Sequence, residues 1–223
     1  MNSSEFDLKE LCEQCHVQDI PDFLKKIEKL YEVLTETNKT MNLTRIQSCE
    51  DFLNKHVADS LLIASHFPDI SSANYSIADI GCGGGFPSLV LASAFPNLTL
   101  SPVDSTGKKI KYVNFAAGEI GLKNLVATQG RACELNRQKD WQNRFDIVTA
   151  RAVAKSMKLF VEVDNMIKND GRMIFYKTPD QVADEFGQLC KISQKQKFSW
   201  SKTKIYSLPG GDGMRQFIYG GKK

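Results

Sequence analysis

The sequence predicts an α/β protein with a Rossmann-like, mostly parallel sheet, an antiparallel hairpin near its C-terminus and a helical cap at its N-terminus. Short apolar runs alternate with amphipathic segments between residues 76 and 177, as in parallel strands joined by crossover helices. Two more apolar runs follow, separated by turn-forming residues. The 223 residues, 42% hydrophobic and 25% charged, suffice for one packed domain and are not typical of disordered proteins.

Residues 5–67 have the periodicity of helices. Pro21 stands where the first turn of a helix tolerates proline, and apolar residues then recur at steps of three and four. Those residues are Phe23, Ile27, Leu30, Tyr31 and Leu34. A second helix is predicted to begin at Ser48, because Asp51 three residues later resembles the acidic partner of a capping box.

The alternating region supplies the sheet. The predicted strands are Ser76–Ile80, Leu98–Asp104, Leu125–Gln129, Phe145–Ala150 and Arg172–Lys177. The predicted helices are Phe86–Ala94, Lys108–Ala117, Ser156–Ile167 and Asp180–Cys190. Pro102 cannot donate a ladder hydrogen bond, so we expect a local bulge there. We expect residues 1–70 to form the N-terminal helical cap and residues 71–223 to form the main domain, as one compact unit.

The C-terminal part is predicted to end in two strands. Trp200–Leu208 and Met214–Tyr219 flank the turn-forming segment Pro209–Gly213, which is typical of a hairpin. Residues 191–223 contain eight lysines and arginines and one acidic residue, Asp212. This charge either attracts an anionic partner such as nucleic acid or forms a solvated basic surface, and the sequence leaves both alternatives open.

The cysteines and the N-terminus indicate a cytoplasmic protein. Cys12, Cys15 and His16 have the spacing of a c-type haem attachment site, but that chemistry needs export, and a zinc site needs a second pair of ligands. We therefore interpret both cysteines as ordinary helix residues and predict no metal site. No apolar run is long enough for a membrane span, and the N-terminus lacks the hydrophobic core of a signal peptide.

A glycine-rich run follows the first predicted strand. Gly81 and Gly83 allow a sharp turn and a close approach to a ligand. The dinucleotide fingerprint would need glycine at position 86, where the chain has Phe86. Asp79, two residues before the run, would repel phosphate but suits the cationic amine of S-adenosylmethionine. Asp104 ends the second predicted strand, where an acid accepts hydrogen bonds from ribose hydroxyls or caps the next helix.

The sequence is compatible with methylation of a ring nitrogen. It has no Pro-Cys pair of the kind used for carbon methylation of pyrimidines, and no Asn/Asp-Pro-Pro-aromatic run of the kind used for exocyclic amines. A ring nitrogen carries its own lone pair, so it needs alignment with the methyl group rather than covalent attack or proton removal.

Several short segments occur in an order that resembles one family. Together they resemble the bacterial small-subunit rRNA guanine-N7 methyltransferases, the glucose-inhibited division protein B family, over roughly residues 20–220. The segments are Met41–Thr44, His56–Leu61, Gly85–Pro87, Val103–Lys109, Phe145–Val148, Ala150–Ala152 and Asp212–Arg215. The resemblance implies the class I S-adenosylmethionine-dependent methyltransferase fold, with that cofactor bound by residues 71–223. It also implies transfer of a methyl group to N7 of one guanosine in 16S rRNA.

The resemblance also implies roles for individual residues. Cofactor contacts fall on Gly81, Phe86, Ala132, Cys133 and Arg151, and Asp79, Gly83 and Asp104 complete the predicted cofactor site. Catalytic roles fall on Arg151 and Lys177. Contacts with RNA are predicted for Asn42, His56, Asp59, Lys108, Lys109 and Arg215. The implied partner is 16S rRNA or the small ribosomal subunit, and we expect a monomer in the cytoplasm.

Alternatives remain for several of these roles. Arg151 either donates to guanine O6, as arginine does at guanine edges, or pairs with Asp79 or the cofactor carboxylate. His56 and Asp59 form either a packing or capping pair or a contact with substrate. Lys108, Lys109 and Lys111, with the basic C-terminal segment, are predicted to contact rRNA phosphates. A small-molecule methyltransferase and a non-catalytic nucleotide- or RNA-binding module are the alternative functions.

Overall fold

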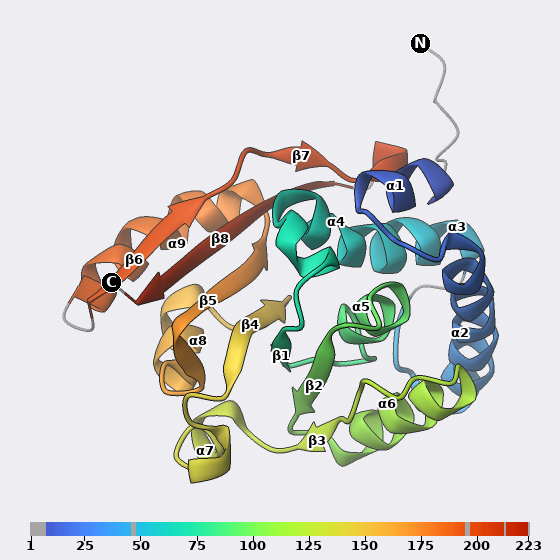
Figure 1. Cartoon of the computed structure of the whole chain (residues 1–223), viewed down its shortest axis with the longest axis horizontal. Helices are drawn as coiled ribbons and strands as arrows, with labels where there is room; N and C mark the ends of the chain where they lie inside the picture. The colour runs from blue at the N-terminus through green and yellow to red at the C-terminus, as the bar shows by residue number, and fades with distance from the viewer. Residues whose placement is uncertain (1–7, 46–47, 195–196, 212, 223) are drawn as a thin grey trace.

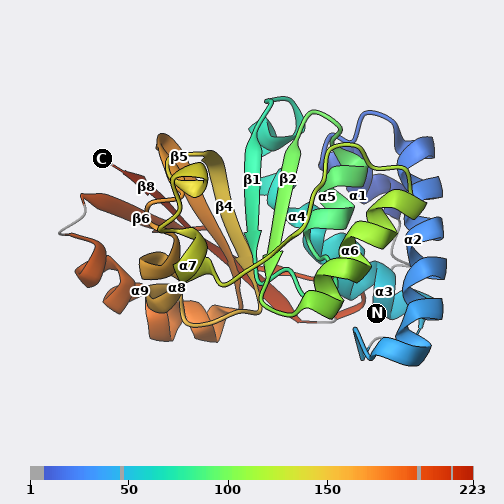
Figure 2. The same cartoon turned by 90° about the horizontal axis from the view of Figure 1, so that it is seen from below.

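The structure is a computed structural model and describes residues 8–45, 48–194, 197–211 and 213–222. A central twisted sheet separates two layers of helices (Figures 1 and 2). Helices α4, α5 and α6 cover one face with α2 outside them, and helices α7, α8 and α9 cover the other (Figure 2). Lys195, Asp212 and Lys223, which belong to the charged C-terminal segment, lie outside the described residues.

The N-terminal region is helical, as predicted, but it is divided into short elements. These are α1 (Leu8–Gln14), α2 (Ile20–Met41), α3 (Cys49–Phe52), the π-helical turn η1 (Leu53–Ala58), α4 (Asp59–His66) and the 3₁₀ turn η2 (Pro68–Ser71). Pro21 lies in the first turn of α2, where the side chain of Asp19 accepts a hydrogen bond from the N–H of Asp22 at 3.0 Å. The predicted cap at Ser48 is confirmed, because its Oγ accepts from the N–H of Asp51 at 3.0 Å.

The two N-terminal cysteines are core residues. Cys12 lies in α1, and Cys15 lies one residue beyond its end; both side chains are fully buried. The Sγ of Cys15 donates to the carbonyl oxygen of Leu61 at 3.4 Å, which ties α1 to α4. Burial raises the pKa of the Cys15 thiol to about 12, so this thiol is a poor nucleophile near neutral pH. None of the described helices has both the length and the apolar character that a membrane span requires.

The sheet confirms the predicted α/β class. Its strands are β1 (Ser76–Ile80), β2 (Thr99–Asp104), β3 (Thr128–Gln129), β4 (Phe145–Arg151), β5 (Ile167–Lys177), β6 (Phe198–Lys202), β7 (Tyr206–Ser207) and β8 (Met214–Lys222). They lie in the order β3-β2-β1-β4-β5-β8-β6, with β7 paired to β8. Strands β1 to β5 pair in parallel, and β8 pairs antiparallel with β5, β6 and β7. The C-terminal hairpin is therefore present, although its first arm is divided into β6 and β7.

The crossover helices are α5 (Ser88–Ala94), α6 (Gly107–Glu119), α7 (Ala132–Leu135), α8 (Ser156–Val163) and α9 (Pro179–Ser193). Short 3₁₀ turns, η3 (Lys139–Trp141) and η5 (Pro209–Gly211), complete the described elements. The prediction that a helix extends to Ile167 is wrong, because the chain leaves α8 at Val163. The side chain of Asn136 accepts from the N–H of Asn165 at 3.1 Å, and Ile167 already pairs with Phe145 in the sheet.

Pro102 lies within β2 without the expected bulge. The register between β1 and β2 runs through five consecutive residue pairs without a shift. The N–H of Leu100 donates to the oxygen of Asn124, on the β3 side of the strand, at 2.8 Å. Since N–H directions alternate along a strand, Pro102 faces the same side. There the ladder is interrupted between the isolated pairing of Leu100 with Leu125 and the start of β3 at Thr128, so the missing donor breaks no ladder bond.

Two hydrophobic clusters fill the spaces between the layers. One joins the N-terminal helices to α5, α6 and the sheet, and its fully buried members include Leu30, Phe52, Leu61, Leu89 and Val113. The other lies under α8 and α9 and includes Val148, Phe160, Phe175 and Leu189. Burying a side chain of this size stabilises a fold by about 1.5–3 kcal/mol. The N-terminal cap thus shares its hydrophobic core with the sheet. The boundary between a cap of residues 1–70 and a main domain of residues 71–223 stays a prediction.

Candidate active site

A cavity of about 720 Å³ opens at the carboxyl ends of β1, β2, β3 and β4. Ligands of parallel α/β sheets bind at this edge, and the volume is in the range of cofactor sites. Predicted site residues line it from four successive loops and from η1. They are His56, Gly81, Gly83, Phe86, Asp104, Lys109, Ala132, Cys133 and Arg151.

The glycine loop after β1 presents bare backbone to this cavity. Gly81 and Gly83 have φ values of +70° and +56°, a left-handed conformation that strains other residues. The N–H of Gly81 donates to the oxygen of Val103 at 2.7 Å, which anchors the loop on β2. A Cβ at Gly81 would lie 2.6 Å from the side chain of Val153, whereas a Cβ at Gly83 would meet no atom closer than 4.0 Å. A side chain at Gly83 would therefore project into space that a ligand can use.

Asp104 at the end of β2 caps the local backbone and still faces the cavity. Its Oδ2 accepts from the N–H of Gly83 at 3.1 Å, and its Oδ1 accepts from the N–H of Thr106 at 2.8 Å. The ammonium group of Lys109 lies 3.9 Å from Oδ2. A carboxylate has about four lone-pair positions, so capacity remains for ribose hydroxyls. Capping and ligand binding, the two roles that the sequence left open, are thus compatible in one side chain.

Asp79 does not line the cavity, contrary to the prediction that it holds a cationic amine. Its side chain is fully buried beneath the glycine loop, where Oδ2 accepts from the hydroxyl of Ser88 at 2.7 Å. Oδ1 has no hydrogen-bond partner among the described residues. Burial raises the pKa of Asp79 to about 6, although the charge of Arg151 and the bonds from Ser88 oppose this shift. Asp79 therefore supports the loop from below.

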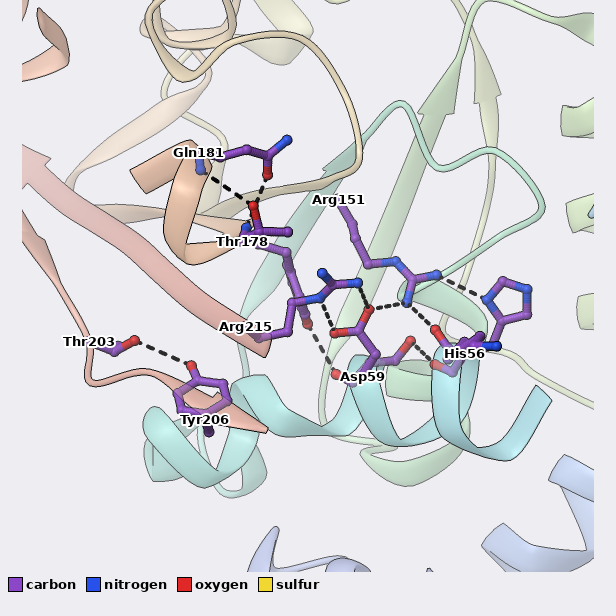
Figure 3. Close-up of polar contacts among 11 residues, drawn as sticks. His56, Asp59, Arg151, Thr178, Gln181, Thr203, Tyr206 and Arg215 are labelled. Atoms are coloured by element: carbon purple, nitrogen blue, oxygen red, sulfur yellow. Dashed lines mark hydrogen bonds and ion pairs between the residues drawn. The ribbon is translucent and has the colours of Figure 1, made fainter. Parts of the chain in front are cut away.

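Asp59 holds two arginines that come from distant parts of the chain (Figure 3). Its carboxylate is 1% exposed and accepts from Nη1 of Arg151 at 3.0 Å, and from Nε and Nη2 of Arg215 at 2.8 and 3.0 Å. Arg151 is the last residue of β4, Arg215 is the second residue of β8, and Asp59 is the first residue of α4. Arg151 thus forms its ion pair with Asp59 rather than with Asp79, and the burial of the Asp59 carboxylate favours a positioning role over the predicted contact with RNA.

His56 and Phe86 form the wall behind Arg151. Their rings are stacked, with centroids 4.1 Å apart and planes 2° from parallel, and the guanidinium carbon of Arg151 lies 5.9 Å from the Phe86 centroid. Burial, together with the charge of Arg151, lowers the pKa of His56 to about 3, so this ring is neutral at pH 7. Its Nδ1 accepts from Nη2 of Arg151 at 3.3 Å, which leaves Nε2–H to donate to the hydroxyl of Thr44 at 3.2 Å. This geometry favours the packing role for His56.

Lys177 is set back from the cavity, contrary to the prediction of a catalytic role. It is 5% exposed, its Nζ lies 2.9 Å from Oε2 of Glu185, and it donates to the oxygen of Ala154 at 3.2 Å. The same Glu185 oxygen accepts from the N–H and the hydroxyl of Ser156 at 2.8 and 2.6 Å. Lys177 therefore fixes the loop between β4 and α8, directly after Arg151.

The remaining residues predicted to contact RNA lie in four places. Lys109 is at the cavity, whereas Lys108 lines a separate groove between α2 and α6. Asn42 is exposed at the end of α2 in a left-handed conformation, with φ of 49°. Arg215 is a quarter exposed and is bound to Asp59. The structure thus gives Arg215 a positioning contact and leaves Asn42, Lys108 and Lys109 accessible.

Sequence reasoning missed other residues of the cavity wall. They include Leu43, Thr44, Ser105, Thr106, Arg131, Val153 and Glu162. Thr44 belongs to the Met41–Thr44 segment of the family resemblance, which was a usable signal. Glu162 comes from α8, and no local pattern connects that helix face to the cavity. Within the described ranges, His, Cys, Asp and Glu side chains form no group of three that could hold a metal ion.

The fold is that of S-adenosylmethionine-dependent methyltransferases. The chain is similar to the O-methyltransferase from Bacillus cereus in complex with SAH, with a TM-score of 0.60, 16% identity and coverage of 88% of this chain and 91% of that chain. It is also similar to a SAM-dependent methyltransferase from Aquifex aeolicus, with a TM-score of 0.56, 13% identity and coverage of 76% and 92%. Both likenesses confirm the predicted fold class.

Sequence comparison identifies the family. The family described as rRNA small subunit methyltransferase G (GidB) matches residues 23–209. Ribosomal RNA small subunit methyltransferase G of an Exiguobacterium species is 35% identical over 198 residues, which cover 87% of this chain and 81% of that protein. The protein of that name from Lactobacillus johnsonii is 34% identical over 194 residues, with coverage of 87% and 81%. The chain belongs to the rRNA small subunit methyltransferase G family, which confirms the resemblance.

Proposed function

We propose that this protein is an enzyme that transfers the methyl group of S-adenosylmethionine to N7 of a guanosine in 16S rRNA. The observation that carries the proposal is one cavity that combines the glycine loop and Asp104 with Arg151, held at its wall by the buried carboxylate of Asp59. The membership of the rRNA small subunit methyltransferase G family supports it. The same proposal assigns 16S rRNA or the small ribosomal subunit as partner, a monomeric state and a cytoplasmic location.

The cavity fits the cofactor. The backbone at Gly83 leaves open space where a Cβ would project, and the Asp104 carboxylate suits ribose hydroxyls. Ala132 and Cys133, which the family resemblance assigns to the cofactor, line the cavity after β3. When bound, S-adenosylmethionine supplies an electrophilic methyl group next to a sulfonium cation. Phe86, stacked on His56, gives that region a rigid apolar wall.

The chain's own residues orient the acceptor rather than remove a proton. Guanine N7 carries a lone pair and no proton, so methylation there requires no general base. This matches a wall in which His56 is neutral, with its pKa lowered to about 3, and is engaged through both ring nitrogens. Catalysis is then a matter of alignment, which contributes strongly when the reacting atoms are held in place.

Arg151 is the residue that we assign to the guanine edge. Its guanidinium has five N–H donors. Among the described residues, three of them bind Asp59, His56 and the backbone oxygen of Lys55. Two N–H groups are left for guanine O6 or for the cofactor carboxylate. Donation to O6 would hold the neighbouring N7 in a defined direction.

The test is transfer of labelled methyl from S-adenosylmethionine to 16S rRNA and to small subunits that lack the modification, followed by nucleoside analysis. We expect label in 7-methylguanosine at one position. We also expect its loss in Arg151→Ala, with cooperative unfolding retained. Binding of S-adenosylhomocysteine without methylation of any RNA would refute the assignment and would leave small-molecule methylation or a binding role.

A further inference from the structure

A second concave surface lies between the C-terminal half of α2 and α6, with a volume of about 470 Å³. Its lining residues are Thr37 and Met41 of α2, and Lys108, Lys111, Tyr112 and Phe115 of α6. The four α6 residues lie on one face, because they are separated by helical steps of three and four. Tyr112 is buried as part of the floor, whereas the Phe115 ring is 54% exposed. We call this surface the α2–α6 groove.

The charges beside the groove are positive and are not neutralised locally. Lys108 and Lys111 are both exposed. In the part of the chain that the structure describes, neither forms an ion pair, whereas the neighbouring Lys109 approaches Asp104. An exposed aromatic ring between two available cations suits a ligand with a flat apolar part and negative charges on either side. A nucleotide of single-stranded RNA has this composition.

The α2–α6 groove lies near the active-site cavity, because two segments of the chain contribute residues to both. Met41 lines the groove, and Leu43 and Thr44, which follow it, line the cavity. Likewise Lys108 lines the groove, and Lys109 lines the cavity. An RNA strand whose reacting guanosine enters the cavity would therefore leave it beside the groove.

We propose that the α2–α6 groove binds a second base of the substrate RNA. A nucleotide near the reacting guanosine stacks on Phe115, and its flanking phosphates contact Lys108 and Lys111. The target base must leave its own stack to be methylated, and capture of a neighbouring base holds the strand in that open form. This inference rests on the proposed function. It adds Phe115 as an RNA-binding residue that does not discriminate between bases, because every base has a face that can stack.

The test measures binding and methylation of an unmodified 16S rRNA transcript by Phe115→Ala. Loss of one stacked base is expected to weaken the Kd by about 5- to 150-fold. KM for RNA should rise in parallel, while kcat at saturating RNA and the affinity for S-adenosylhomocysteine stay within twofold. Phe115→Trp should keep tight binding, since a larger ring also stacks. The double variant Lys108→Ala/Lys111→Ala should reduce the slope of log K against log salt by about 1.4, at about 0.7 per phosphate contact.

Matched controls lie elsewhere on the surface. Val161→Ala removes a side chain of α8 that is also 54% exposed, and Lys25→Ala removes an exposed lysine on α2 outside the groove. A Phe115→Ala variant that binds and methylates the transcript like these controls overturns the inference. So does a variant that changes only the oligomeric state, which would make the groove a contact between copies. Failure of the wild-type chain to methylate any RNA refutes the proposed function itself. The two outcomes are distinguishable, because the groove inference is tested only by comparing variants with an active wild-type chain.

Discussion

Replacing Asp59 by asparagine removes the single negative charge that Arg151 and Arg215 share. Asparagine has nearly the same shape but offers one acceptor oxygen where the carboxylate offers two, and its amide repels the donors that face it. The side chain is 1% exposed, so water cannot take over the lost contacts. Two guanidinium groups would then lie close together without their common counter-ion.

The expected loss of stability can be worked from the contacts. Asp59 accepts three hydrogen bonds from charged donors at 2.8 to 3.0 Å. Removing one partner of a buried ion pair costs about 3–5 kcal/mol. Arg215 is a quarter exposed and recovers part of its solvation, so we expect the lower end, about 3 kcal/mol. For a chain of this size, that corresponds to a fall in Tm of about 6–12 °C.

Two assays separate the structural and catalytic consequences. Urea unfolding gives the free energy of unfolding, and methyl transfer to unmodified 16S rRNA gives kcat. We expect kcat to fall by about 100-fold at temperatures where the variant is folded, because a shift of about 1 Å at Arg151 has that effect. Affinity for S-adenosylhomocysteine should change less. Asp184→Asn, at an exposed carboxylate on α9, is the control. An Asp59→Asn variant within 0.5 kcal/mol of wild type and with full kcat would refute this reasoning.

Four other predictions concern separate parts of the structure. Burial raises the pKa of Asp79 from 3.8 to about 6, so the folded state binds the proton more tightly and the free energy of unfolding falls as pH rises through that interval. Asp79→Asn should remove this pH dependence of the unfolding free energy, measured by urea titrations. The folded state lowers the pKa of His56 from 6.5 to about 3, so the free energy of unfolding should decline as pH drops below 6.5. In the same urea titrations, His56→Phe should reduce that decline. Lys177→Met and Glu185→Gln should be non-additive by about 0.5–3 kcal/mol in a double-mutant cycle, whereas a purely catalytic Lys177 would leave stability unchanged. Thr178 caps α9 and exchanges hydrogen bonds with Gln181 (Figure 3); Thr178→Ala should cost about 1 kcal/mol in unfolding free energy and Thr178→Ser much less.

Local patterns were sufficient for most of the fold. Strand β1 has the predicted bounds, and the cap at Ser48 and the proline in the first turn of α2 are where the residues indicated. These features depend on backbone preferences and on apolar periodicity, which neighbouring residues determine. One prediction that failed, a helix extending to Ile167, lies where pairing of that residue with Phe145 outweighs helical periodicity.

In the candidate site too, some residues could be found from local patterns and others could not. Gly81, Gly83 and Asp104 were found from spacing alone, because the topology of a parallel sheet brings the ends of neighbouring strands to one edge. The burial of Asp79 beneath that edge was not visible, since its neighbour Ser88 comes from the next helix. The family resemblance implies a catalytic role for Lys177, and its ion pair with Glu185 of α9 was likewise not visible in the sequence.

The sequence by itself determined the class of the sheet, the position of its ligand-binding edge and the family, because each of these is encoded in short ordered segments. Only the tertiary structure decided which charged groups reach the cavity. Asp59, Arg151 and Arg215 are separated by up to 156 residues, and their pairing arises because α4, β4 and β8 converge at one place. Charges that meet over such separations leave no local pattern, and the burial that decides their roles exists only once the layers have packed.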